Sequence, residues 1–252
     1  MKYLETYKTF EKKKSSKKKD DKKFVPPKIY SEAEIKKRWD KKRSQIKKLS
    51  KDIRKFKIRV DKDLTSDNQK TMIIATIAKI MEITGERVGN DGSASEGRHG
   101  ISNLQKKHIK VNGDTITIKY KGKSHVDHDQ TFTHAKVAKN LKELMKRPTK
   151  DIFSTDDGIS IKSTQVNKYL EQFDITSKDL RGFKANKLMT QELRKLGKVK
   201  EEKDRKKKFN ELLRKVADQI QHGAPTLRKH YLLPEIEDNF YKHGSIGRVQ
   251  SI

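Results

Sequence analysis

Apolar residues recur with two different periods along this chain, and the periods predict where helices and strands lie. From Ser31, apolar positions return every three or four residues, which predicts a long amphipathic helix over residues 31–56. Ser31 and Glu34 form a capping-box pattern at its start. Residues 66–84 are apolar on nearly all sides, so we expect a second helix that is buried all round.

Strict alternation replaces the helical period within residues 101–133. Ile109 and Val111 alternate with polar positions, the turn sequence NGD follows, and TITIKY alternates again. The segment QTFTH reads as a third strand. We therefore predict a small antiparallel sheet, with Lys123 at the tip of its second hairpin.

From residue 134 onward the apolar pattern is helical to the end of the chain. The predicted helices cover residues 134–146, a segment that begins at Ser163, residues 177–195, residues 200–221 and part of the tail 235–252. The expected fold class is therefore mainly α with a small antiparallel three-stranded sheet, that is, α+β.

The charge of the chain indicates its partner. Its 252 residues include 62 Lys and Arg against 34 Asp and Glu, a formal net charge of +28, which is typical of proteins that bind nucleic acid. Lysines dominate residues 1–30, which we interpret as a flexible arm, followed by an amphipathic helical segment over 31–60 and a main domain over 61–252.

Other compositional features exclude several classes. There is no cysteine, so disulfide and thiolate chemistry are excluded. We expect no membrane span, because no apolar run approaches the roughly 20 residues that a span needs. The N-terminus shows no secretory signal, so we expect an intracellular protein, in the cytoplasm, the nucleoid, a virus or a host nucleus.

Several residues have the chemistry to bind phosphate. Arg87 follows the buried helix between two glycines, and Lys178 and Arg181 lie one turn apart at a predicted helix start, where an anion is favoured. A metal site at His125, His128 and Asp129 is not expected, because their spacing is loose and no thiol supports it.

Tyr231 lies in the segment HGAPTLRKHYLLP, nine positions after His222. A lone tyrosine usually packs, and it becomes a nucleophile only where cations stabilise the charge that develops on the attacked group. Two arginines can clamp the oxygens of a phosphodiester under attack, a histidine can donate a further hydrogen bond, and a lysine can protonate the departing oxygen. Such a set needs neither metal nor ATP.

Five motifs occur in an order that resembles the catalytic domain of type IB DNA topoisomerases of the poxviral and bacterial kind. The motifs are ERVGND, HGISNLQKKHIKV, YKGKSH, TSKDLRGFKAN and HGAPTLRKHYLLP, and the likeness covers about residues 50–236. It implies a tyrosine recombinase-like core and catalytic roles for Arg87, Lys123, Arg181, His222 and Tyr231. It departs from the family at the front, where lysine-rich residues stand in place of a clamp domain.

The resemblance also implies duplex DNA as the partner, no cofactor and no metal, a monomer, and DNA contacts from Lys178, Asn90, Arg228 and Lys229. A tyrosine recombinase or integrase uses the same chemistry and is the nearest alternative. Those proteins usually have His-x-x-Arg where this chain has Lys178-Asp179-Leu180-Arg181. A non-catalytic basic protein that coats DNA is a further alternative, although it does not need this set of residues in this order.

Overall fold

The computed structural model describes residues 31–94, 96–122 and 125–247. The arm predicted for residues 1–30 and the candidate Lys123 lie outside these described residues. Tertiary contacts divide the chain into Met1–Lys37 and Arg38–Ile252, and everything after the first turns of α2 belongs to the second unit.

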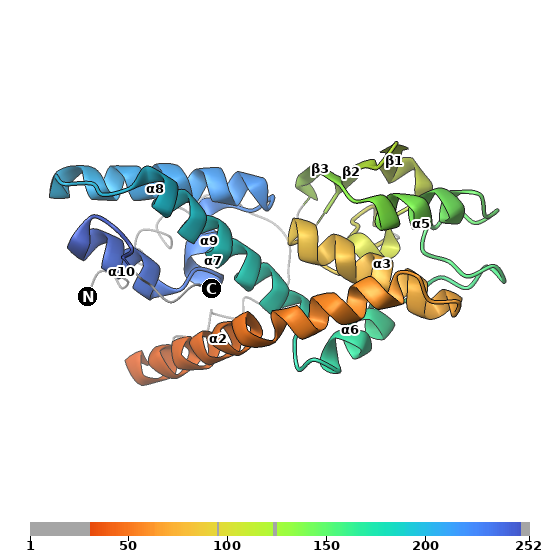
Figure 1. The fold of residues 1–252 in the computed structure, drawn as a ribbon, viewed down its shortest axis with the longest axis horizontal. Coiled ribbons are helices and arrows are strands. Elements are labelled where there is room, and N and C mark those ends of the chain that lie inside the picture. The colour runs from red at the N-terminus through yellow and green to blue at the C-terminus, as the bar shows by residue number, and fades with distance from the viewer. Residues whose placement is uncertain (1–30, 95, 123–124, 248–252) are drawn as a thin grey trace, which may run out of the picture. The chain divides into compact units, whose positions relative to one another are not determined.

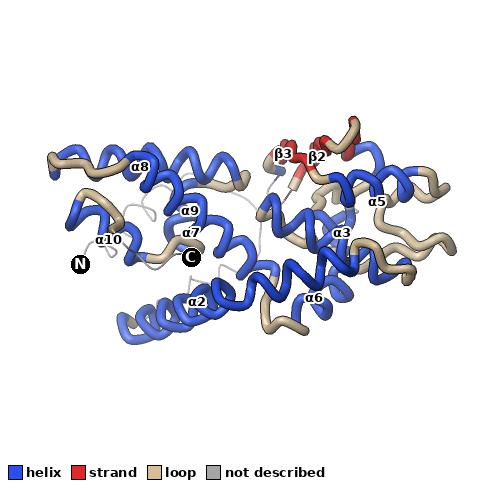
Figure 2. Tube along the Cα trace, in the orientation of Figure 1, coloured by secondary structure: helices blue, strands red, loops and turns tan. Residues whose placement is uncertain are grey.

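Helices account for most of the described chain, and three strands form one antiparallel sheet, which confirms the predicted fold class (Figures 1 and 2). The helices are α2 (Glu32–Asp63), α3 (Gln69–Thr84), α4 (Asp91–Ala94), α5 (Ala135–Met145), α6 (Ser163–Glu171), α7 (Ser177–Leu196), α8 (Glu202–Gln219), α9 (Ala224–His230) and α10 (Pro234–His243), and the strands are β1 (Ile109–Asn112), β2 (Thr115–Lys121) and β3 (Asp127–Thr133).

The first two predicted helices are present with different ends. The Ser31–Glu34 capping box forms, with the Glu34 N–H donating to Ser31 Oγ at 3.2 Å, and α2 then continues without a break to Asp63. The domain boundary expected at residue 60 therefore falls inside a continuous helix. Helix α3 starts three residues later than expected, because Asn68 Oδ1 accepts the Thr71 N–H at 3.0 Å and caps it.

The sheet has the predicted alternation. Strand β2 lies between β1 and β3, and its residues Ile116, Ile118 and Tyr120 are buried while their neighbours face outward. The third strand starts at Asp127 rather than within QTFTH, because Asp127 pairs with Lys121 and extends the β2–β3 ladder. His128 and Asp129 thus lie in strand β3.

Two hydrophobic clusters make up the core of the second unit. The first joins α3, the sheet, α5 and α6, and the second joins α8, α9 and α10. Helix α7 belongs to both: Leu180 and Phe183 pack in the first cluster, whereas Met189 and Leu193 pack in the second. The start of α7 therefore lies where the two clusters adjoin. Within the described residues, no helix is long and apolar enough to cross a membrane.

Candidate active site

Arg87 is held in place by the way α3 ends. Gly85 adopts a left-handed conformation, φ 74°, and its N–H bonds to Met81 O at 2.8 Å, which stops the helix. The next residues are extended, and their carbonyls accept from a neighbouring loop, with Ile101 N–H reaching Arg87 O at 3.0 Å. A backbone fixed on both sides gives the half-buried Arg87 side chain a defined starting point.

Two glycines let this loop approach closely. A Cβ on Gly100 would lie 2.3 Å from Gly89 Cα, so the two segments can cross only where no side chain intervenes. Gly89 itself has φ 108°. Gly100, the last residue of GRHG, therefore has a structural use here.

Arg181 is buried at the start of α7. Only 2% of its surface is exposed, and its Nη2 donates to Ile220 O at 3.1 Å. Lys178, one turn earlier, is exposed, and the expected pairing of these two cations on one phosphate-binding face stays a prediction. The helix cap is Thr176 rather than Ser177, with its Oγ1 accepting from the Asp179 N–H at 3.2 Å.

His222 meets Arg87 at the end of α8. Gln221 takes a positive φ of 51°, and the turn brings His222 Nε2 to 3.2 Å from Arg87 Nη2. Burial, followed by the charges of Arg181 and Arg87, lowers the pKa of His222 to about 4. The imidazole is therefore neutral near pH 7, and Nε2 accepts the arginine N–H.

Asn186 clamps the backbone on either side of Tyr231. Its Nδ2 donates to Tyr231 O at 2.8 Å, and its Oδ1 accepts the Leu233 N–H at 2.8 Å. The Tyr231 N–H bonds to Leu227 O at 2.9 Å, which ends α9. Because Asn186 is completely buried in α7, the position of Tyr231 is tied to that helix.

The side chains of these elements converge on the Tyr231 ring. The His222 ring lies 5.3 Å from it, centroid to centroid, and Arg181 Cζ lies 5.9 Å from its centroid. Tyr231 keeps 8% of its surface exposed, and within the described residues its hydroxyl has no hydrogen-bond partner. The arrangement places a phenol beside the Arg181 guanidinium and the His222 imidazole, and a second guanidinium, that of Arg87, bonds to this imidazole. Such a set of groups suits the charge of a phosphate under attack.

A buried carboxylate that sequence reasoning missed lies beside these cations. Glu86 accepts from Tyr120 Oη at 2.9 Å and from His128 Nδ1 at 2.8 Å, and its carboxylate lies 3.5 Å from Arg181 Nη2. The Tyr120 and His128 rings stack at 4.6 Å. A charged residue two positions after the end of a mostly apolar helix was the available signal.

The predicted DNA contacts have different surroundings. Lys178 and Lys229 are exposed, and Asn90 is exposed with its Oδ1 accepting the Gly92 N–H at 3.0 Å. Arg228 forms a bidentate pair with Glu237, with Nε 2.7 Å from Oε2, and lies over the Phe209 ring at 5.9 Å. Its guanidinium joins α9 to α10, so we do not assign it a DNA contact.

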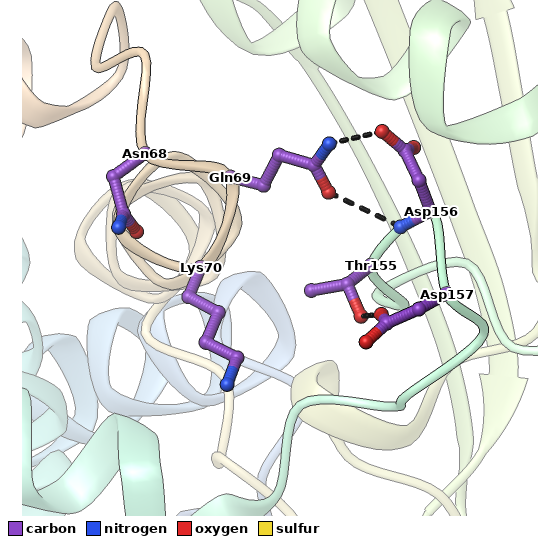
Figure 3. Close-up of a pocket in the computed structure, with 6 residues that line it drawn as sticks. All are labelled: Asn68, Gln69, Lys70, Thr155, Asp156 and Asp157. Carbon is purple, nitrogen blue, oxygen red and sulfur yellow. Dashed lines mark hydrogen bonds between the residues drawn. The ribbon is translucent and has the colours of Figure 1, made fainter.

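The rest of the described surface adds no second chemical centre. Among the described residues, no three His, Cys, Asp or Glu side chains form a metal-binding group. A shallow pocket of about 430 Å³ is lined by residues at the start of α3 and in the loop 155–157, where Gln69 and Asp156 bond to each other (Figure 3). None of the candidate active-site residues lines this pocket.

Comparison with known proteins gives three findings. The family model for the catalytic core of eukaryotic DNA topoisomerase I matches residues 32–235. The DNA topoisomerase 1B of Acanthamoeba polyphaga mimivirus is 28% identical over 195 residues, which cover 69% of this chain and 58% of that protein. A crystal structure of the XerH site-specific recombinase bound to its palindromic difH substrate has a TM-score of 0.45 at 15% identity, over 91% of this chain and 57% of that one.

Proposed function

This chain belongs to the eukaryotic DNA topoisomerase I catalytic-core family, and we propose that it relaxes supercoiled DNA by breaking and rejoining one strand of the duplex. The chain spans 58% of the length of its mimivirus relative, and the motifs of the proposed chemistry fall within the matched residues. The proposed product of cleavage is a bond between Tyr231 and the 3′ phosphate of the broken strand.

One observation carries this proposal: Arg181 and His222 both flank the Tyr231 ring, and Arg87 bonds to that histidine. Three elements far apart in the sequence supply these groups. A site built only for packing has no need of one guanidinium group beside a tyrosine and a second on the neighbouring histidine, whereas a phosphodiester under attack does.

In the proposed step, the Tyr231 oxygen forms a bond to phosphorus while the bond from phosphorus to the 5′ oxygen breaks. Arg87 and Arg181 bind the non-bridging oxygens. When the Arg87 guanidinium turns to the phosphate, neutral His222 is released from its N–H and donates a hydrogen bond rather than a proton. Lys123 protonates the leaving 5′ oxygen, and the phenol proton passes to solvent. The reverse step reseals the strand, and no ATP is needed because the phosphotyrosyl ester keeps the bond energy.

The direct test traps the covalent intermediate. DNA labelled at the 3′ or 5′ end is mixed with the protein and quenched with SDS, and the label that stays with the protein reports both covalency and polarity. We expect adducts through the 3′ phosphate, and we expect Tyr231→Phe to remove them while DNA binding persists. Persistence of adducts in Tyr231→Phe would assign the nucleophile elsewhere.

A second assay separates relaxation from strand transfer. We expect supercoiled plasmid to relax without ATP and with EDTA present. Strand exchange between two sites without relaxation would support a recombinase instead, and tight binding with neither activity would indicate a protein that coats DNA.

The remaining proposals concern the setting of this reaction. All proposed site residues lie in one chain, which supports action as a monomer. We propose duplex DNA as its substrate and the inside of a cell or virus as its setting. We propose that Lys178, Lys229 and Asn90 contact DNA beside the site and that the lysine-rich residues 1–30 bind its backbone non-specifically. The relative is a DNA topoisomerase 1B of a virus, and this supports the proposal that the chain acts on viral DNA.

A further inference from the structure

We infer that Glu86 is a positioning residue, whose buried carboxylate couples Arg181 to the end of the β2–β3 hairpin that leads into Lys123. The inference rests on the proposed function and adds a residue to it. Glu86 does not touch the Tyr231 ring; it acts through the groups that flank the reaction.

The contacts of Glu86 join three elements. Its two oxygens take hydrogen bonds from Tyr120 on β2 and His128 on β3, and Arg181 on α7 supplies the nearby positive charge. Each of these residues is at least nine-tenths buried: Glu86 is 1% exposed, Arg181 2%, Tyr120 6% and His128 8%. Hydrogen bonds and ion pairs in such a dry environment fix geometry more strongly than the same contacts do in water.

The hairpin end depends on His128. Tyr120 and His128 are direct partners in the β2–β3 ladder, so one carboxylate bonds to both members of a cross-strand pair. A Cβ on Gly122 would lie 2.4 Å from His128 Nε2, which shows that the imidazole packs against the backbone one residue before Lys123. The Glu86–His128 bond therefore holds the imidazole that packs against Gly122.

The buried guanidinium of Arg181 needs the negative charge of the Glu86 carboxylate. Arg181 is buried, its Nε has no hydrogen-bond partner among the described residues, and Ile220 O is a neutral acceptor. Glu86 supplies a negative charge 3.5 Å from Nη2, which is farther than a hydrogen bond. The pair thus holds the guanidinium in place by charge, while Arg181 Nε keeps no partner among the described residues.

Glu86→Gln keeps the volume of the side chain and removes its charge. It therefore tests the contact with Arg181 and the contacts with the β2–β3 hairpin together. Single-turnover formation of the adduct is measured on ordinary DNA and on DNA whose 5′ leaving oxygen is replaced by sulfur, which hardly needs a proton. We expect cleavage of ordinary DNA to be slowed by about 10²-fold, as for other small displacements of catalytic groups. On sulfur DNA we expect the slowing to be smaller by a factor of at least about five, because the contribution of Lys123 is bypassed there.

The matched control is Asp129→Asn. Asp129 is next to His128 on β3, but its carboxylate pairs with Lys119 at 2.7 Å on the exposed face of the sheet. This variant should cleave both substrates at the wild-type rate, whereas a general weakening of the sheet would affect both variants alike. Tyr120→Phe, which removes one hydrogen bond and keeps the ring, is the second test variant, and it decides the matter if Glu86→Gln does not fold.

Two results would overturn the inference: a folded Glu86→Gln protein that cleaves at the wild-type rate, or one that is slowed equally on oxygen and sulfur DNA. Both differ from failure of the proposed function, in which the wild-type protein itself forms no adduct.

Discussion

His222 accepts a hydrogen bond from Arg87 at 3.2 Å across 135 positions of sequence. The contact joins the segment after α3 to the end of α8, and it requires a neutral imidazole. Its consequence is a pH dependence that stability measurements can detect.

Acid should destabilise the fold through His222. Its pKa in the folded chain is about 4, below the usual 6.5, so between these values the unfolded chain binds more protons than the folded one. The contribution of His222 to stability is complete above pH 6.5 and is lost as the pH falls toward 4. We expect the free energy of unfolding, from urea titrations, to fall between pH 7.5 and pH 5, and to fall less in His222→Asn.

His125→Asn is the control for that measurement, because His125 is an exposed histidine. Its pH dependence should match that of the wild type. A residual slope is expected in His222→Asn, since burial also lowers the pKa of His108 to about 4. Equal slopes in all three proteins would show that His222 is not held neutral.

Asn186→Asp should separate the position of Tyr231 from stability. The change keeps the shape but removes the two hydrogen bonds that Asn186 donates to Gly182 O and Tyr231 O. We expect a loss of about 1–3 kcal/mol in unfolding free energy and about 10²-fold slower adduct formation.

Asn140→Asp provides the comparison, because Asn140 donates to Leu64 O and to Thr76 Oγ1 in the other hydrophobic cluster. It should cost a similar amount of stability and leave cleavage unchanged below the unfolding temperature. If both variants slow cleavage to the same extent, stability and not the clamp explains the loss.

Gly100→Ala should disturb Arg87 through the backbone. The new methyl group would lie 2.3 Å from Gly89 Cα, and neither backbone segment can move without breaking its hydrogen bonds. We expect a lower melting temperature, equivalent to about 1–3 kcal/mol, and slower adduct formation. Gly92→Ala, whose new group would meet only Asn90 Oδ1 at 3.5 Å, should behave as the wild type does in both measurements.

Lys178→Ala and Arg228→Ala should affect different properties, the first DNA binding and the second stability. Lys178 is exposed near the proposed site, so its loss should weaken DNA binding and reduce the salt slope by roughly one unit. Arg228 is committed to Glu237 and Phe209, so its loss should lower stability and leave the salt slope unchanged. Fluorescence anisotropy over a salt series, together with thermal melts, distinguishes the two; a reduced slope in Arg228→Ala would restore its predicted DNA contact.

Periodicity was sufficient to predict the longer helices, the three strands and the fold class, because burial of one face governs both patterns. The short helices α4 and α9 were not predicted. Periodicity could not place Glu86 or Asn186, since their partners lie on other elements and no local pattern marks a buried hydrogen bond between segments. It also could not tell that Arg181 is buried while Lys178 is exposed, because spacing gives a shared helix face but packing decides which cation is buried. The late start of α3 has a similar cause, since Asn68 and not an earlier polar residue caps the helix.

Helix α7 carries Arg181 in its first turns and Asn186 farther along, and it packs in both hydrophobic clusters. Loosening of either cluster would therefore pull a different member of the site out of alignment. Heat or denaturant should therefore abolish strand cleavage before the chain unfolds globally. Activity would then report partial unfolding sensitively.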